Sequence, residues 1–232
     1  IKIKPDLAEA YGNMGIAFKN KGDLKSAIAS FKKALIIKPN MPEACCNIGL
    51  AIRPFVFSKS SPEFEKIIIS LLESKTFVRP KDISKTALSL IKLQPSLQKY
   101  LPTKYRNKIK QSVQTVVEDL YQVPLLLKFM SVCPIADIEL ELLLTKIRSA
   151  LLFSISKIPN SQSILSFQSA LALQCFTNEY IYSQSGAETK ALKELELVIS
   201  TTLSKGEKLC LHSLMCLAAY KPLVDYEWSN CL

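Results

Sequence analysis

Histidine and glycine are scarce in this sequence, which has one histidine, His212, and six glycines among 232 residues. A Ser-His-Asp triad, a Cys-His pair or a histidine metal site would have to be built around that one residue. Neither G-x-G-x-x-G nor G-x-x-x-x-G-K-[ST] occurs, so no phosphate-cradling loop is visible. We therefore expect no catalytic, cofactor-binding or metal-ligating residue in this chain, and whether it forms part of an enzyme stays open.

Long apolar runs are missing as well, although 48% of the residues are hydrophobic. The leucine run at 125–127 ends at Lys128, and the run at 142–144 is soon followed by Lys146, whereas a membrane span needs about 20 apolar residues. We therefore expect no membrane partner. This apolar content also excludes a disordered chain. With so few glycines and abundant Leu, Ala, Lys, Ile and Ser, the composition indicates an all-α fold.

Cysteine occurs seven times, without a C-x-x-C pair and without a signal peptide ahead of it. The positions are Cys45, Cys46, Cys133, Cys175, Cys210, Cys216 and Cys231. The odd count and irregular spacing favour buried, reduced thiols and hence a cytoplasmic location. A redox or metal cluster is the alternative, and the spacing does not favour it.

The net charge of +10 is unevenly distributed. Residues 1–53 carry +5, residues 54–110 carry +8 and residues 111–232 carry −3. A basic first half suggests nucleic acid as a ligand. However, the cations near residue 107 are spread around a helix and no aromatic platform accompanies them, so we expect no nucleic-acid partner. Those cations are Lys104, Arg106, Lys108 and Lys110.

Three short strings recur at one fixed interval along the chain. They are KPD at 4–6 with KPN at 38–40, EA at 9–10 with EA at 43–44, and NMG at 13–15 with NIG at 47–49. The interval of 34 is the period of the tetratricopeptide repeat (TPR), and residues 8–41 resemble one complete repeat. The signature residues are Tyr11, Met14, Gly15, Phe18, Gly22, Ala27, Phe31, Ala34 and Pro39. The resemblance implies two antiparallel helices that stack into an α-solenoid and bind a protein or peptide.

Physical chemistry supports the match position by position. Gly15 and Ala27 are small where two antiparallel helices would cross closely. Gly22 would end the first helix and Asp23 would cap the second, which Pro39 would stop. The space between the helices would be filled by Tyr11, Phe18, Phe31 and Leu35.

The repeat pattern fades on both sides of residues 8–41. Residues 1–7 resemble the tail of an earlier repeat, so the chain is expected to be a piece of a longer protein. Residues 42–52 resemble the first helix of another repeat, and Arg53-Pro54 then breaks the pattern. We predict a TPR region at 1–53, a basic helical connector at 54–110, and an all-helical domain at 111–232 that precedes a missing C-terminal domain.

Asparagine occupies the same repeat position twice, at Asn13 and Asn47. This resembles the repeats of protein O-GlcNAc transferases, which implies an asparagine ladder along a peptide-binding groove. An amide both donates and accepts, so it can pair with an extended peptide backbone. The alternative is a pair of solvated surface residues. A lysine/asparagine carboxylate clamp is not favoured, because its positions hold Gly12 and Ile16. The basic surplus of 1–53 favours an extended, somewhat acidic ligand.

The remaining sequence predicts further helices and no sheet. We expect them at about 61–73, 80–94, 103–120, 124–133, 137–157, 162–181, 187–204 and 207–220. Those between 123 and 181 are apolar almost all round, which indicates either the centre of a helical domain or an interface for a missing neighbour. The architecture is thus a short TPR-type α-solenoid followed by an irregular multi-helix domain.

Residues 77–223 resemble the helical middle region of bacterial TPR proteins that carry a class I S-adenosylmethionine-dependent methyltransferase domain further on. The strings are FVRPKDI at 77–83, LSLIK at 88–92, PLLL at 124–127, ELLLTKIR at 141–148, ALQCFTNEY at 172–180 and AAYKPL at 218–223. The resemblance implies a substrate-recruiting, non-catalytic part of a methyltransferase, with S-adenosylmethionine bound by a missing domain. The alternatives are a stand-alone interaction scaffold and the TPR region of a glycosyltransferase-type enzyme. The oligomeric state stays open.

A few single residues have both a functional and a structural interpretation. The run Asn178-Glu179-Tyr180 could line a site, but a helix end with Glu179 in water explains it as well. His212 lies between leucines on an apolar helix, which favours a packing role. Trp228 fits either a packed position or a disordered tail.

Overall fold

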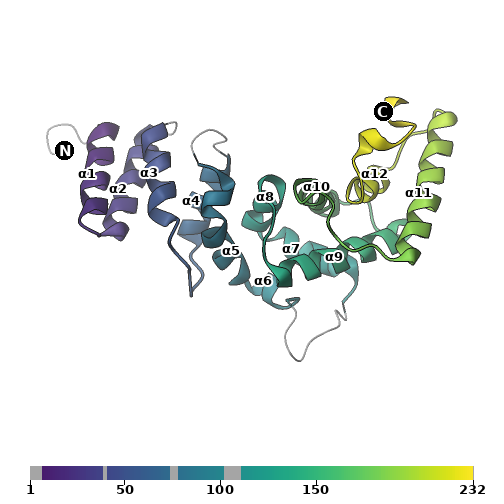
Figure 1. The fold of residues 1–232 in the computed structure, drawn as a ribbon, viewed down its shortest axis with the longest axis horizontal. Helices are drawn as coiled ribbons and strands as arrows, with labels where there is room; N and C mark the ends of the chain where they lie inside the picture. Colours follow the sequence, from purple (N-terminus) through teal and green to yellow (C-terminus); the bar gives the residue numbers. More distant parts are fainter. Residues whose placement is uncertain (1–6, 39–40, 74–77, 102–110, 232) are drawn as a thin grey trace. The chain divides into compact units, whose positions relative to one another are not determined.

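The computed structural model describes residues 7–38, 41–73, 78–101 and 111–231, and these ranges contain helices and no strand (Figure 1). The predicted all-α fold is therefore confirmed. The chain packs as two compact units, residues 1–90 and residues 91–232, which we call the first and second units. None of the described helices is both long and apolar enough to cross a membrane.

The first unit begins with three helices that lie side by side (Figure 1). Its elements are α1 (Ala8–Asn20), α2 (Leu24–Ile37), α3 (Pro42–Ile52), α4 (Pro62–Glu73), the 3₁₀ helix η1 (Pro80–Ile83) and α5 (Ser84–Lys92), whose last two residues belong to the second unit. A cluster of Ala8, Ala34, Met41 and Ala44 joins α1, α2 and α3, with Tyr11 and Leu35 packed against it.

The turn between α1 and α2 forms from the two residues expected to make it. Gly22 has φ +81°, a left-handed conformation that glycine adopts without steric cost. The Asp23 side chain then accepts a hydrogen bond from the Ser26 backbone N–H at 3.0 Å, which caps α2. The two helices are thereby set antiparallel with a short connection.

Close approach of α1 and α2 depends on Gly15. A Cβ atom at this position would lie only 2.5 Å from Phe31 Cε1, whereas carbon atoms in contact lie about 3.5–4.0 Å apart. Ala27, Phe31 and Ala34 on α2 are completely buried. The missing side chain of Gly15 therefore makes the space that the Phe31 ring fills.

The second glycine of the repeat pattern, Gly49, has a different partner. A Cβ atom there would lie 2.7 Å from Val78 Cγ2, so a residue just before η1 takes the place that a helix phenylalanine takes in the complete repeat. The Thr86 hydroxyl donates to the Ile52 carbonyl at 2.8 Å and ties α5 to the end of α3. The segment after α3 therefore packs against that helix differently from the way α2 packs against α1.

The second unit is built around α10. Its elements are α6 (Pro95–Gln98), α7 (Val113–Tyr121), α8 (Pro124–Val132), α9 (Ile138–Phe153), η2 (Ile155–Lys157), α10 (Gln162–Thr177), α11 (Gly186–Ser204), α12 (Leu211–Ala218), η3 (Leu223–Asp225) and η4 (Ser229–Cys231). Helix α10 contacts α7, α8 and α12, and its Phe167 is completely buried. Helix α10 therefore packs against other helices on several sides.

Several expected helix limits were wrong. Helix α7 begins at Val113, because the Ser112 hydroxyl caps it, and not near residue 103. Helix α10 ends at Thr177 and not near 181, since Glu179 and Tyr180 have left-handed φ values of 53° and 57°. Helix α12 covers only Leu211–Ala218. The basic residues between 104 and 110 lie outside the described residues, as does the signature residue Pro39.

Candidate functional site

Two helices of the first unit, α1 and α3, expose matching side chains at equivalent repeat positions. The two helices contact each other, and Lys19 Nζ donates to Asn47 Oδ1 at 3.0 Å between them. We define the α1–α3 face by four pairs, each separated by one repeat period: Glu9 and Glu43, Asn13 and Asn47, Ile16 and Leu50, and Lys19 and Arg53. None of these side chains is buried.

The two predicted asparagines both lie outside the core. Asn13 is exposed, and Asn47 is half-buried with its carbonyl oxygen accepting from Lys19. That bond leaves the Asn47 amide nitrogen able to donate. Their spacing of one repeat period and the contact between α1 and α3 place the two amides on neighbouring helices of one unit. Their role in a peptide-binding ladder stays a prediction.

An apolar pair follows the asparagines by one helical turn, at positions i+3. The exposed fractions are 36% for Ile16 and 58% for Leu50. Positions i, i+4 and i+7 share one face of a helix, so each asparagine lies between an acidic and an apolar side chain. The apolar pair was not predicted, although the repeat period relates Ile16 to Leu50.

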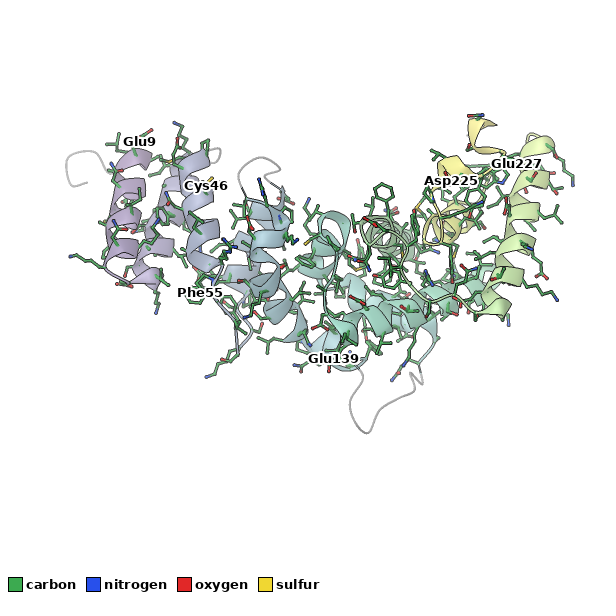
Figure 2. All side chains as sticks on the ribbon, in the orientation of Figure 1. Glu9, Cys46, Phe55, Glu139, Asp225 and Glu227 are labelled. Atoms are coloured by element: carbon green, nitrogen blue, oxygen red, sulfur yellow. The ribbon has the colours of Figure 1, made fainter. Side chains whose placement is uncertain are left out.

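Charge is arranged at both ends of the α1–α3 face. Glu9, in the first turn of α1 (Figure 2), pairs with Lys38 at 3.4 Å, and the helix-start backbone together with Lys38 lowers the pKa of its carboxyl group. At the other end, Lys19 and Arg53 supply two cations. One acidic member of the face is thus neutralised by its neighbour, which leaves the cationic end with more net charge.

The TPR signature residues have packing positions. Phe31, Ala27 and Ala34 are buried, while Tyr11, Met14 and Phe18 are half-buried. The Lys33 ammonium lies 5.5 Å from the centre of the Tyr11 ring, a cation–π distance.

His212 is buried within the second unit. Its Nδ1 lies 2.6 Å from Gln168 Oε1 and its Nε2 lies 3.0 Å from Asn160 Oδ1. Gln168 also donates to the His212 carbonyl oxygen at 3.4 Å. These bonds join α12 to α10 and to the loop before α10, and desolvation lowers the pKa of the imidazole. This geometry gives the histidine a structural role.

The run at 178–180 and Trp228 are also explained by packing. The Tyr180 hydroxyl donates to the Ala218 carbonyl at 3.3 Å, and Glu179 is exposed. Trp228 is 8% exposed and stacks on Tyr226 with ring centres 4.8 Å apart. Trp228 is therefore packed within the second unit and is not part of a disordered tail.

No disulfide bond joins the six cysteines whose side chains the structure describes. Four are buried, at Cys45, Cys133, Cys175 and Cys216. Burial raises the pKa of the Cys175 thiol to about 11 and that of Cys216 to about 12. Cys210 is exposed, which corrects the expectation of burial, because it lies at the N-cap position before α12. No group of three or more metal-ligating side chains occurs within the described part of the chain.

Comparison with protein families matches residues 8–41 to the tetratricopeptide repeat, the same span that the sequence period indicates. Such repeats generally mediate protein or peptide binding. No curated protein and no solved structure matches this chain. The resemblance of residues 77–223 to methyltransferase-linked proteins receives no support from these comparisons.

Proposed function

We propose that the chain is an interaction scaffold whose α1–α3 face binds an extended peptide. The observation that carries this proposal is the pair of accessible amides, Asn13 and Asn47, each beside an exposed aliphatic side chain. The amides would pair with the peptide backbone, and Ile16 and Leu50 would contact its side chains.

Spacing supports an extended ligand. Packed helices lie about 8–10 Å apart, and an extended chain advances about 3.3 Å per residue. Two neighbouring asparagines therefore match backbone groups about three residues apart. Each amide can make two hydrogen bonds, and each bond contributes about 0.5–1.5 kcal/mol net.

The chemistry of the face favours a peptide with aliphatic and acidic side chains. Lys19 and Arg53 lie at one end of the α1–α3 face, and the first 53 residues carry nine Lys and Arg against four Asp and Glu. A carboxylate near these cations would gain a charge-assisted contact. Leucine-sized side chains would cover part of Leu50, which is 58% exposed.

The experiment measures fluorescence anisotropy of labelled decapeptides in which leucine alternates with glutamate, serine or lysine. We expect the glutamate peptide to bind best. The variant Asn13→Ala/Asn47→Ala should bind it about tenfold or more weakly, as expected from the loss of two to four hydrogen bonds. The matched control is Gln111→Ala/Gln122→Ala, which removes two exposed amides of the second unit. Equal affinities for the asparagine variant and the control would refute the asparagine ladder.

Recruitment of a substrate for a methyltransferase is a narrower proposal, and it rests on the resemblance of residues 77–223 alone. In it, S-adenosylmethionine would bind outside this chain. Reading the coding sequence past residue 232 tests it: a strand followed by an acidic, glycine-rich loop would support a methyltransferase, and a stop codon within a few residues would support a stand-alone scaffold. A glycosyltransferase domain in that position would support the third alternative.

A further inference from the structure

A second surface of the first unit, separate from the α1–α3 face, has the form of a binding pocket. A cavity of about 270 Å³ opens between α2, α3 and α4. Its floor consists of Ile48, Ile67 and Leu71, which are buried, and its wall includes Leu35 and Ile36. Ile36 is 76% exposed. Large aliphatic groups therefore line a hollow that is open to water.

The cavity follows from the irregular connection after α3. Nine residues, 53–61, join α3 to α4, whereas three residues join α1 to α2. At the rim, Lys32 of α2 forms an ion pair with Glu63 of α4 and so bridges the two helices. Helix α4 thus meets α2 through long polar side chains at this edge, and Ile36 on the wall of the cavity stays exposed.

The lining of the cavity extends along α4. Its lining includes Glu63, Lys66, Ser70 and Leu71 of that helix, which at 1.5 Å per residue extend over about 12 Å. This is the length of about two helical turns. Aliphatic side chains at positions i and i+4 of a partner helix span about 6 Å along its axis. A hollow of this length accepts such a pair of side chains better than a single compact group.

The rim carries an excess of positive charge. Glu63 is paired with Lys32, which leaves the exposed Lys66 as the further charged group of the lining. Helix α2 contains Lys25, Lys32 and Lys33 and no acidic residue, whereas α4 carries Glu63, Glu65 and Glu73 beside Lys66. Within the lining itself two lysines stand against one glutamate, so a partner carboxylate would complement Lys66.

We propose that this α2–α4 pocket docks a short, acidic amphipathic helix of a partner protein. Two aliphatic side chains of the partner occupy the hollow over Ile67, and a carboxylate of the partner pairs with Lys66. This site is independent of the α1–α3 face, so loss of one leaves the other intact.

The test uses the full chain and two fluorescein-labelled 15-residue helical peptides, each with leucine at positions 4, 8 and 11. One has glutamate at the flanking positions and the other has lysine. We expect the glutamate peptide to bind and the lysine peptide to bind at least tenfold more weakly. Ile36→Glu should weaken binding of the glutamate peptide at least tenfold, and Lys66→Glu at least threefold.

The matched control is Ile181→Glu, since Ile181 in the second unit is also 76% exposed. Ile181→Glu should bind the glutamate peptide with the same affinity as the unmodified chain. Asn13→Ala/Asn47→Ala should do so as well. Circular dichroism checks that each variant keeps its helix content. Equal binding of Ile36→Glu and Ile181→Glu, or no binding of the glutamate peptide at 1 mM, would overturn the proposal. So would a dimer of the chain that Ile36→Glu converts to monomer, because a second copy would then be the occupant.

Discussion

Replacing Gly15 with alanine tests the close approach of α1 and α2. In an exposed helix this substitution stabilises by about 1 kcal/mol, because glycine is a poor helix former. Here the new methyl group would lie 2.5–2.8 Å from three atoms of the Phe31 ring, which is completely buried. The ring therefore has to move by about 1 Å to restore normal contact distances.

The packing around Gly15 makes the substitution destabilising. Overpacking a core by one methyl group costs about 1–3 kcal/mol, through displaced backbone and side chains forced off their preferred rotamers. The helix-propensity gain offsets only part of that cost. We expect Gly15→Ala to destabilise the first unit by about 1–2 kcal/mol net. Gly186→Ala is the control, because nothing lies within 4 Å of its Cβ position, and it should be neutral or slightly stabilising.

The assay is urea unfolding followed by circular dichroism, with hydrogen exchange locating the weakened region. Trp228, the single tryptophan, lies in the second unit and reports on that unit by fluorescence. In Gly15→Ala, amide hydrogen exchange should be faster in α1 and α2 than in the unmodified chain. In a Phe31→Leu background the smaller side chain leaves room, so the cost of Gly15→Ala should fall by about 0.5 kcal/mol or more, an ordinary coupling energy for residues in contact. A cost that is the same in both backgrounds, or a gain like that of Gly186→Ala, would refute the packing argument.

Three further predictions address the rest of the chain. Residues 1–53 alone should be largely unfolded by circular dichroism, because so few repeats rarely stand alone and Ile48 would lose its partners in α4; a cooperative melt of that fragment would contradict this. Glu188→Gln should cost about 1–3 kcal/mol at pH 7, since the buried carboxylate accepts from the Ser185 N–H at 2.8 Å and the Tyr220 hydroxyl at 2.7 Å. Burial opposes ionisation of Glu188, but these bonds and the nearby Arg148 charge lower its pKa overall. The stabilising contribution of the carboxylate is therefore present above the unfolded-state pKa and is lost as the pH falls through the folded-state pKa. The free energy of unfolding of the variant should accordingly fall less steeply than that of the unmodified chain below about pH 4.5. Titration calorimetry with S-adenosylmethionine should detect no binding, and a micromolar affinity would show that a cofactor site was missed.

The α1–α2 hairpin could be predicted because its determinants are local. Gly22 and Asp23 define the turn, and the repeat period identifies the partner helix. The limits of α10 could not be predicted, because its end depends on left-handed Glu179 and Tyr180, residue types with no strong preference for that conformation. Tertiary contacts in the second unit hold them there, including the Tyr180 hydroxyl on Ala218.

The candidate sites could be predicted only where the sequence repeats itself. The asparagine pair is visible in the sequence because both residues recur at one repeat position. Ile16 and Leu50 recur just as regularly, but an aliphatic residue on a helix is more often in the core, and only the structure shows that both are exposed. The α2–α4 pocket has no sequence signal at all, because it depends on where the nine-residue connection places α4.

The contact between Gly49 and Val78 limits how this repeat array can grow. In a solenoid each repeat leaves an apolar end that the next repeat covers. Here the Val78 side chain packs against Gly49 of α3, and the Thr86 hydroxyl donates to the Ile52 carbonyl at the end of the same helix. The chain thus covers that end of the repeat with its own irregular segment. A consensus repeat inserted after Ile52 would have to displace Val78 and Thr86 before it could stack on α3. These contacts therefore oppose tandem duplication of the repeat on the α3 side.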